Sequence, residues 1–116
     1  VLVADEAERV IGWGSVSAWS DRRAYEGTAE VSVYVDRSSR SGGVGTALLT
    51  ELIERARRAG LHLLISRVTG DNEASTRLHR RFGFTYIGTM HEAGVKFGRY
   101  LDVHLYELIL PAAETR

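Results

Sequence analysis

The sequence predicts a mixed α/β protein, with a central sheet that is mostly antiparallel and helices on its flanks. Three observations carry this prediction. The first third of the chain alternates apolar and polar residues as strands do, two later segments have apolar residues at helical spacing, and strand patterns lie between and after them. The 116 residues, 44% hydrophobic and 26% charged, suit one soluble globular domain over residues 1–116.

The first third is predicted to form three strands. Val1–Ala4 and Arg9–Trp19 flank a polar turn as a hairpin does, and Gly12 and Gly14 mark either a bulge or a close backbone approach. After a polar loop, residues 29–36 alternate cleanly. One face of this strand carries Ala29, Val31, Val33 and Val35, and the other carries Glu30, Ser32, Tyr34 and Asp36.

Two helices and three further strands complete the predicted order. Residues 44–59 have helical spacing and stop at Gly60, a residue typical of a helix end. A second helix starts at Asn72, an N-cap residue, and stops at Gly83. Strands are predicted at 61–68, 84–90 and 101–110, with a loop at 92–100.

Composition excludes several classes of function. Fifteen basic residues balance fifteen acidic ones, so no overall field attracts nucleic acid or anionic lipid, and no apolar run approaches the ~20 residues of a membrane span. The chain has no cysteine, which fits a reducing compartment, and its four histidines lack metal-ligand spacing, so we expect no metal. Val1–Ala4 lacks the pattern of a signal peptide and fits either a fragment or a chain numbered from inside a longer product.

The glycine-rich loop before the first helix is the clearest candidate for ligand binding. Residues 40–46 read Arg-Ser-Gly-Gly-Val-Gly-Thr, and glycines beside the free N–H groups of a helix start suit an anion such as phosphate, as does the Arg40 guanidinium. A P-loop would need Lys and Ser/Thr after the last glycine, and a Rossmann fingerprint would need a third glycine where Leu48 stands. The loop alone supports phosphate binding and a plain glycine-rich turn equally.

Further motifs extend this pattern over nearly the whole chain. Arg-x-x-Gly-x-Gly lies between an alternating strand and a helix, and a later Asn-started helix ends in Gly-Phe. With residues 22–25 (Arg-Arg-Ala-Tyr), 30–35 (Glu-Val-Ser-Val-Tyr-Val) and 96–103 (Lys-Phe-Gly-Arg-Tyr-Leu-Asp-Val), these motifs resemble the GNAT N-acetyltransferases, and within them the phosphinothricin / methionine sulfoximine branch. The resemblance runs from Val1 to about Leu110, without the strand and two helices that open the family's fold and help to wall its amine pocket.

The resemblance implies a GNAT fold and an acetyl-coenzyme A (acetyl-CoA) site. In the family, the glycine-rich loop holds the pyrophosphate, main-chain groups of the preceding strand pair with the pantetheine arm and polarise the thioester carbonyl, and the asparagine at the helix start also bonds that arm. The matching cofactor-binding residues here are Val33, Tyr34, Val35, Arg40, Ser41, Gly42, Gly43, Val44, Gly45, Thr46, Asn72 and, one turn inside the helix, Ser75.

The resemblance also implies catalytic residues. Glu30 matches the family's catalytic glutamate, and we expect it to take the amine proton directly or through a water. His79 stands where many relatives have a tyrosine that protonates the departing thiolate; the alternative is a surface histidine among Arg77, Arg80 and Arg81. Those arginines either meet the 3′-phosphate of coenzyme A or are simply solvated.

For the acceptor, the resemblance implies a small amino acid or analogue. Arg22 and Tyr25 match loop residues that border the acceptor in the family. Arg23 is a further candidate next to Arg22, and Lys96 would add a second positive charge to the acceptor site. The alternative for all four residues is that they only form part of a surface loop. With no cysteine to carry a covalent intermediate, direct acetyl transfer in a ternary complex is expected, in a cytoplasmic homodimer. Two alternatives stay open: a coenzyme A-binding module without turnover, and acetylation of a peptide or protein N-terminus.

Overall fold

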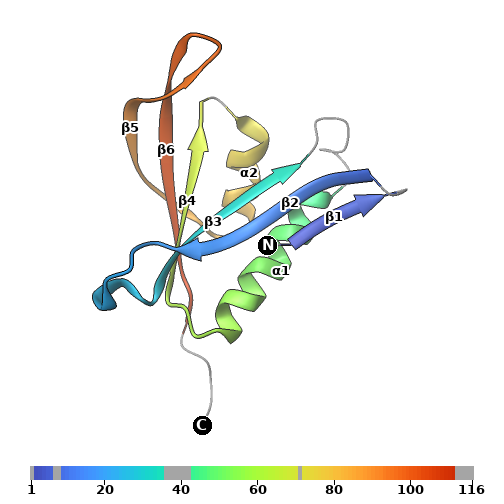
Figure 1. Cartoon of the computed structure of the whole chain (residues 1–116), viewed down its shortest axis with the longest axis vertical. Coiled ribbons are helices and arrows are strands. Elements are labelled where there is room, and N and C mark those ends of the chain that lie inside the picture. Colours follow the sequence, from blue (N-terminus) through green and yellow to red (C-terminus); the bar gives the residue numbers. More distant parts are fainter. Residues whose placement is uncertain (1, 7–8, 36–42, 71, 112–116) are drawn as a thin grey trace.

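The computed structural model of the chain describes residues 2–6, 9–35, 43–70 and 72–111. Six strands form one sheet in the order β1-β2-β3-β4-β6-β5, and two helices pack on it (Figure 1). The elements in chain order are β1 (Leu2–Glu6), β2 (Arg9–Ala18), the 3₁₀ turn η1 (Arg23–Tyr25), β3 (Thr28–Val35), α1 (Val44–Arg58), β4 (Leu63–Thr69), α2 (Glu73–Arg81), β5 (Thr85–Lys96) and β6 (Arg99–Ile109).

The predicted mixed sheet is confirmed. β3 and β4 are parallel, and the other four neighbouring pairs of strands are antiparallel. A parallel pair needs a crossover connection, and α1 supplies it between β3 and β4. The crossover places the start of α1 beside the end of β3, where the glycine-rich loop was predicted to bind a ligand.

The core lies between the sheet and α1. Ala29 and Val31 on β3 and Leu49 and Leu52 on α1 are buried together, and Leu64 on β4 joins them. The predicted alternation of β3 is therefore confirmed at its buried end, since Ala29 and Val31 face α1 whereas Glu30 faces the other side of the sheet.

Gly12 and Gly14 permit a close approach of α1 to β2, and a register shift that leaves Ile11 without a partner on β1 lies beside Gly12, so the structure contains both alternatives that the sequence left open. A Cβ atom at Gly14 would lie 2.7 Å from Leu52 Cδ1, and one at Gly12 would lie 3.0 Å from Val44 Cγ1. Real Cβ atoms essentially never approach other atoms within 3.0 Å, so any side chain at Gly14 would force the buried Leu52 side chain to move.

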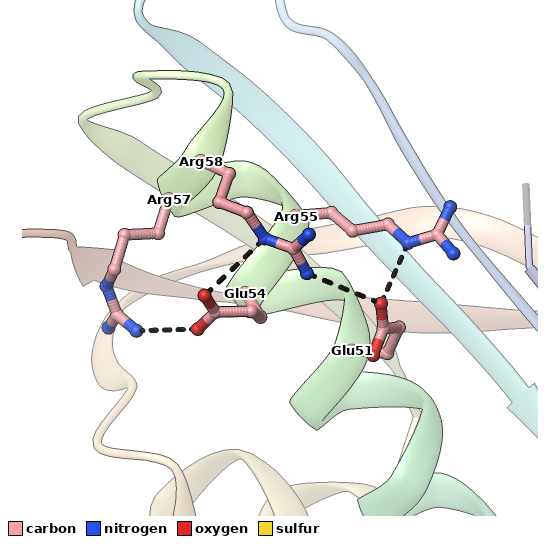
Figure 2. Close-up of polar contacts among 5 residues, drawn as sticks. All are labelled: Glu51, Glu54, Arg55, Arg57 and Arg58. Atoms are coloured by element: carbon pink, nitrogen blue, oxygen red, sulfur yellow. Dashed lines mark hydrogen bonds and ion pairs between the residues drawn. The ribbon is translucent and has the colours of Figure 1, made fainter.

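The exposed face of α1 carries a network of ion pairs. Glu51 bonds Arg55 at 3.0 Å, and Glu54 bonds Arg57 and Arg58, each at 3.5 Å (Figure 2). Pairs at these spacings contribute about 0.2–0.5 kcal/mol each on an exposed helix, so they support α1 without deciding its position. The position of α1 is decided by its apolar face, which is buried against the sheet.

The predicted loop at 92–100 is wrong. β5 continues to Lys96 and β6 begins at Arg99, so these residues form a hairpin whose two-residue turn is Phe97-Gly98. Both turn residues have positive φ, 52° and 73°, the backbone of a type I′ turn, which usually carries Asn-Gly. The sequence did not predict the hairpin because phenylalanine occupies the first turn position. In addition, a register shift between Met90 and Gly94 interrupts the alternation of apolar and polar residues along β5.

Candidate functional site

The site begins where β3 and β4 separate. Their parallel pairing covers only three register pairs, from Thr28↔Leu63 to Glu30↔Ile65. Beyond Glu30 the two strands diverge, with α2 behind the opening (Figure 1). Within the described chain no strand pairs with the β4-facing edge of Val31–Tyr34, which leaves main-chain groups of β3 available to a ligand in the opening.

A cavity of about 370 Å³ lies along this part of β3. Three elements contribute to its walls: the end of β3, the start of α1, and α2. The lining residues are Val33, Tyr34, Val35, Gly43, Gly45, Thr46, Asn72, Ala74, Ser75, Arg77, Leu78 and Arg81. Eight of the twelve residues predicted to bind acetyl-CoA are in this list, and Val44 lies between two members of it.

The glycine-rich loop is described only in part. Arg40, Ser41 and Gly42 lie outside the described residues. Gly43 is the N-cap of α1, with a φ of 81° that suits glycine, and Val44 begins the helix. The first-turn N–H groups of α1 have no partner within the helix and carry its positive dipole end, so they favour an anion by about 0.3–1 kcal/mol.

Contacts between α1 and α2 fix the width of the cavity. A Cβ at Gly45 would lie 3.2 Å from Leu78 Cδ2 and 3.6 Å from Val35 Cγ2, so the first turn of α1 lies close to α2 and to β3. Arg81 Nη1 donates a hydrogen bond to Thr46 Oγ1 at 3.3 Å, which joins the two helices. Arg77 and Arg81 thus bring two positive charges to the wall, whereas Arg80 does not line this cavity.

Asn72 caps α2 as the sequence predicts. Its Oδ1 accepts a hydrogen bond from Ser75 N at 3.0 Å, and both residues line the cavity. A side-chain cap of this kind typically contributes about 1 kcal/mol to helix stability. Asn72 therefore has a structural role whatever the cavity holds.

His79 is buried, so the predicted alternative of a surface histidine is wrong. Only 5% of the residue is exposed. Its Nδ1 donates to the Ser75 carbonyl oxygen at 2.7 Å, which leaves Nε2 to accept the Ser66 hydroxyl at 2.6 Å. The ring packs edge-on against Phe84 and stacks on Tyr106. His79 is not among the cavity-lining residues, but it ties α2, which is one wall, to β4.

Burial lowers the pKa of His79 below its usual 6.5, against the smaller opposing effect of its hydrogen bond to Ser75. Because the unfolded chain then binds the proton more readily than the folded one, the stability from neutral His79 is complete above about pH 6.5 and is lost as pH falls through the lowered pKa. We expect the free energy of unfolding, measured in urea at pH 7.5, 6.5 and 5.5, to fall more steeply with acidity in the wild type than in His79→Gln.

Titration of one such group changes the free energy of unfolding by at most about 1.4 kcal/mol per pH unit. His91→Gln, which removes an exposed imidazole from β5, is the matched control. Identical pH dependence in the wild type and His79→Gln would show that His79 is not the group responsible.

Glu30 lies at the vertex of the opening, on the sheet face opposite α1. Its Oε2 forms an ion pair with Arg67 Nε at 3.2 Å, and its side chain is 23% exposed. The face of the sheet opposite α1 carries no α-helix of the described residues, and the partly buried carboxylate is accessible from this helix-free face. It lies at the start of the β3 edge that lines the cavity. The arrangement suits a base that removes a proton from a group entering from the helix-free face.

The predicted acceptor-site residues lie in exposed segments. Arg23 and Tyr25 are in η1 and Arg22 is its N-cap, with Arg22 N donating to Ser20 Oγ at 3.1 Å. Lys96 is at the end of β5, with Nζ 5.6 Å from the centroid of the Phe97 ring. No hydrogen bond or ion pair of the described residues joins any of the four to Glu30.

Sequence analysis missed Arg67, which the structure brings to Glu30. The available signal was its charge, since Arg67 is the one charged residue in the segment that forms β4. Among the described residues, no group of three His, Asp or Glu side chains could hold a metal ion. None of the described helices is long and apolar enough to span a membrane.

Comparisons with known proteins agree with this geometry. The chain is 45% identical over 111 residues to L-methionine sulfoximine/L-methionine sulfone acetyltransferase from Pseudomonas aeruginosa, covering 95% of this chain and 64% of that protein. Ribosomal-protein-alanine N-acetyltransferase from Brucella melitensis has a TM-score of 0.85 at 41% identity, over 93% of this chain and 67% of that one. A GNAT superfamily phosphinothricin acetyltransferase from Sinorhizobium meliloti, solved with acetyl-CoA, has a TM-score of 0.83 at 38% identity, over 91% and 57%.

The chain thus spans less than two thirds of the length of the Pseudomonas enzyme. The acetyltransferase (GNAT) family matches residues 1–84, a segment that contains β3, the start of α1 and all of α2. The family match therefore covers every element that lines the cavity, and the chain belongs to the GNAT acetyltransferase family.

Proposed function

We propose that this protein is an acetyl-CoA-dependent N-acetyltransferase that acylates the amine of a small amino acid or analogue, of the methionine sulfoximine or phosphinothricin type. The observation that carries the proposal is the position of Glu30 at the start of the opening whose β3 edge lines the 370 Å³ cavity. The cavity and the carboxylate lie on opposite faces of the sheet, so donor and acceptor can meet at the opening without sharing one pocket. The names of the relatives supply the substrate class.

The residues around the cavity fit acetyl-CoA. The first turn of α1 offers N–H donors for phosphate oxygens, and Arg77 and Arg81 add positive charge to the same wall. Asn72 and Ser75 offer polar groups on α2, and the unpaired edge of β3 offers main-chain donors and acceptors for an extended amide-containing chain. We propose that Arg40, Ser41 and Gly42 complete the phosphate site.

Acetyl-CoA supplies a thioester, whose acyl carbon an uncharged amine can attack. Glu30 would take a proton from the amine, directly or through a water, as the N–C bond forms and the C–S bond breaks. One main-chain N–H group of the Val33–Val35 segment would stabilise negative charge on the carbonyl oxygen, and such a donor is typically worth about 2.7–4 kcal/mol. Transfer would be direct, because the chain has no cysteine to carry the acetyl group.

Proton donation by His79 to the leaving thiolate stays a prediction. Both ring nitrogens are already bonded within the protein, and Ser75 Oγ, 3.4 Å from Nδ1, is the group that connects the histidine with the cavity. Any proton from His79 would therefore pass through Ser75. We propose that the main contribution of His79 is to hold α2 against β4.

On the acceptor side, we propose that Arg22, Arg23, Tyr25 and Lys96 border the bound amino acid, as the family resemblance implies. A cytoplasmic homodimer is proposed on the same ground. The exposed apolar side chains of the β5–β6 hairpin support association of two copies, because Val95 is 67% exposed and Phe97 is 90% exposed.

A second candidate function is acetylation of a protein N-terminus, which the name of the Brucella protein favours. A third is a module that holds coenzyme A without turnover. A thiol-release assay with acetyl-CoA separates these functions, because the cysteine-free protein contributes no thiol of its own. We expect release with methionine sulfone, methionine sulfoximine or phosphinothricin; release with alanine-terminated peptides alone would favour the second function, and binding without release would favour the third.

Filling the cavity should remove donor binding. In Gly45→Val the new side chain would crowd Leu78 and Val35 and project from the cavity wall, so we expect acetyl-CoA affinity, measured by calorimetry, to fall at least about tenfold. Gly88→Val on β5 is the matched control, since a Cβ there meets no heavy atom within 4 Å. Wild-type affinity in a folded Gly45→Val protein would mean that acetyl-CoA binds elsewhere.

A further inference from the structure

We propose that Arg67 forms, with Glu30, a subsite for the two charges of an α-amino acid, in which Arg67 binds the acceptor's carboxylate beside the base. The inference rests on the proposed function and deepens it. It assigns a carboxylate-binding residue that the sequence motifs do not include, and it narrows the acceptor to compounds that carry a free carboxylate next to the reacting amine.

Strand register places the two side chains together. Glu30 is the last residue of β3 that pairs with β4, opposite Ile65, and Arg67 is two residues beyond Ile65 on β4. Alternation along a strand puts Ile65 and Arg67 on one face of the sheet, the face to which Glu30 also points. A cation and an anion therefore lie at the vertex of the opening, on the side from which the acceptor would approach.

The guanidinium of Arg67 is held in position, and its two terminal nitrogens still have hydrogen-bond donors to offer. Its Nε forms an ion pair with Glu30 Oε2 at 3.2 Å, and its Cζ lies 5.7 Å from the centroid of the Trp19 ring. No hydrogen bond or ion pair among the described residues uses Nη1 or Nη2, and the side chain is 48% exposed. The two terminal nitrogens keep the fork geometry with which arginine binds a carboxylate in bidentate fashion.

The charges match those of an α-amino acid. Glu30 Oε1 has no partner among the described residues, so it can accept from the ammonium group while Oε2 keeps its ion pair with Arg67. An α-amino acid carries ammonium and carboxylate on one carbon, which brings both within reach of adjacent side chains. Of the basic side chains that the structure describes, Arg67 is the one that forms an ion pair with Glu30, whereas Arg22 and Lys96 do not.

Stability alone is a weak reason for this pair. A half-exposed ion pair contributes only about 0–1 kcal/mol to stability. The pair also has a cost for catalysis, because a positive charge beside Glu30, the proposed base, makes that carboxylate less ready to accept a proton. A carboxylate-binding role explains why a positive charge lies beside the base. The Arg67 guanidinium would neutralise the carboxylate of the substrate at the point where the substrate enters.

The test compares L-methionine sulfone with its primary amide, which keeps the amine and loses the carboxylate. We expect the wild type to favour the acid, and Arg67→Met to raise KM for the acid about tenfold to hundredfold while leaving KM for the amide unchanged. Arg67→Lys should recover part of the preference. Acetyl-CoA affinity and the melting temperature should stay at wild-type values, as in the matched control Arg55→Met on the outer face of α1.

Two results would overturn the assignment while leaving the proposed function intact. One is an unchanged acid-to-amide ratio in Arg67→Met, and the other is an equal loss of kcat for both substrates, which would mean that Arg67 only positions Glu30. Failure of the wild type to acetylate any amino acid or analogue would instead contradict the proposed function itself, and the assignment with it.

Discussion

Replacing Glu30 with glutamine should lower kcat for acetyl transfer by about 10²–10⁴-fold, the range typical of a lost general base. Glutamine keeps the size and polarity of the side chain, but it loses the charge that pairs with Arg67 and cannot take up the amine proton. The measurement is thiol release from acetyl-CoA with a saturating amino-acid acceptor. Acetyl-CoA affinity should be unchanged, because Glu30 is not among the cavity-lining residues.

Glu51→Gln is the matched control for this change. Glu51 is on the exposed face of α1, where its carboxylate bonds Arg55 and Arg58, so its replacement should leave turnover unaltered. Undiminished turnover in Glu30→Gln would keep the enzyme and remove Glu30 as its base. A rise in KM without a change in kcat would mean that Glu30 binds the acceptor but does not take its proton.

Truncation of Leu49 should produce the largest loss of stability. The residue is fully buried and packs in the cluster with Val31 on β3 and Leu64 on β4, so Leu49→Ala both removes apolar contact and leaves a cavity. Substitutions of this kind cost about 2–5 kcal/mol. Urea denaturation at neutral pH, followed by circular dichroism, would measure the change in the free energy of unfolding.

The neighbouring Thr50 provides the control, since it is exposed one position along the same helix. Thr50→Ala should change the free energy of unfolding by less than about 0.5 kcal/mol. A loss below 1 kcal/mol in Leu49→Ala would show that the interface between α1 and the sheet tolerates truncation, and that the position of α1, and so of the cavity, is less firmly set than its burial indicates.

Local pattern predicted both helices and most strands. Asn72 and Gly83 bracket α2, Gly60 follows α1 with a φ of 81°, and the alternation of residues 29–35 matches β3. These features depend on residues a few positions apart, and such signals survive folding because tertiary contacts reinforce them. The β5–β6 hairpin was missed because its turn places phenylalanine where glycine or asparagine is usual.

Some residues of the candidate site could likewise be predicted from local sequence, and others could not. The glycine-rich loop and Asn72 are local motifs, so the sequence identified the start of α1 and of α2 as a binding region, and family resemblance singled out Glu30. Arg67 had no motif to mark it. Its role follows from the parallel register of β3 and β4 and from the point at which their pairing ends, and neither can be read from either strand alone.

By itself, then, the sequence determined the mixed α/β class, the order and caps of the helices, and the candidate phosphate loop, because hydrophobic period and cap chemistry are properties of neighbouring residues. Only the tertiary structure decided that β3 and β4 part after Glu30, that His79 is buried between α2 and β4, and that Arg67 forms an ion pair with Glu30. These three features join segments far apart in the chain, and it is packing of α1 and α2 on one sheet that brings those segments together.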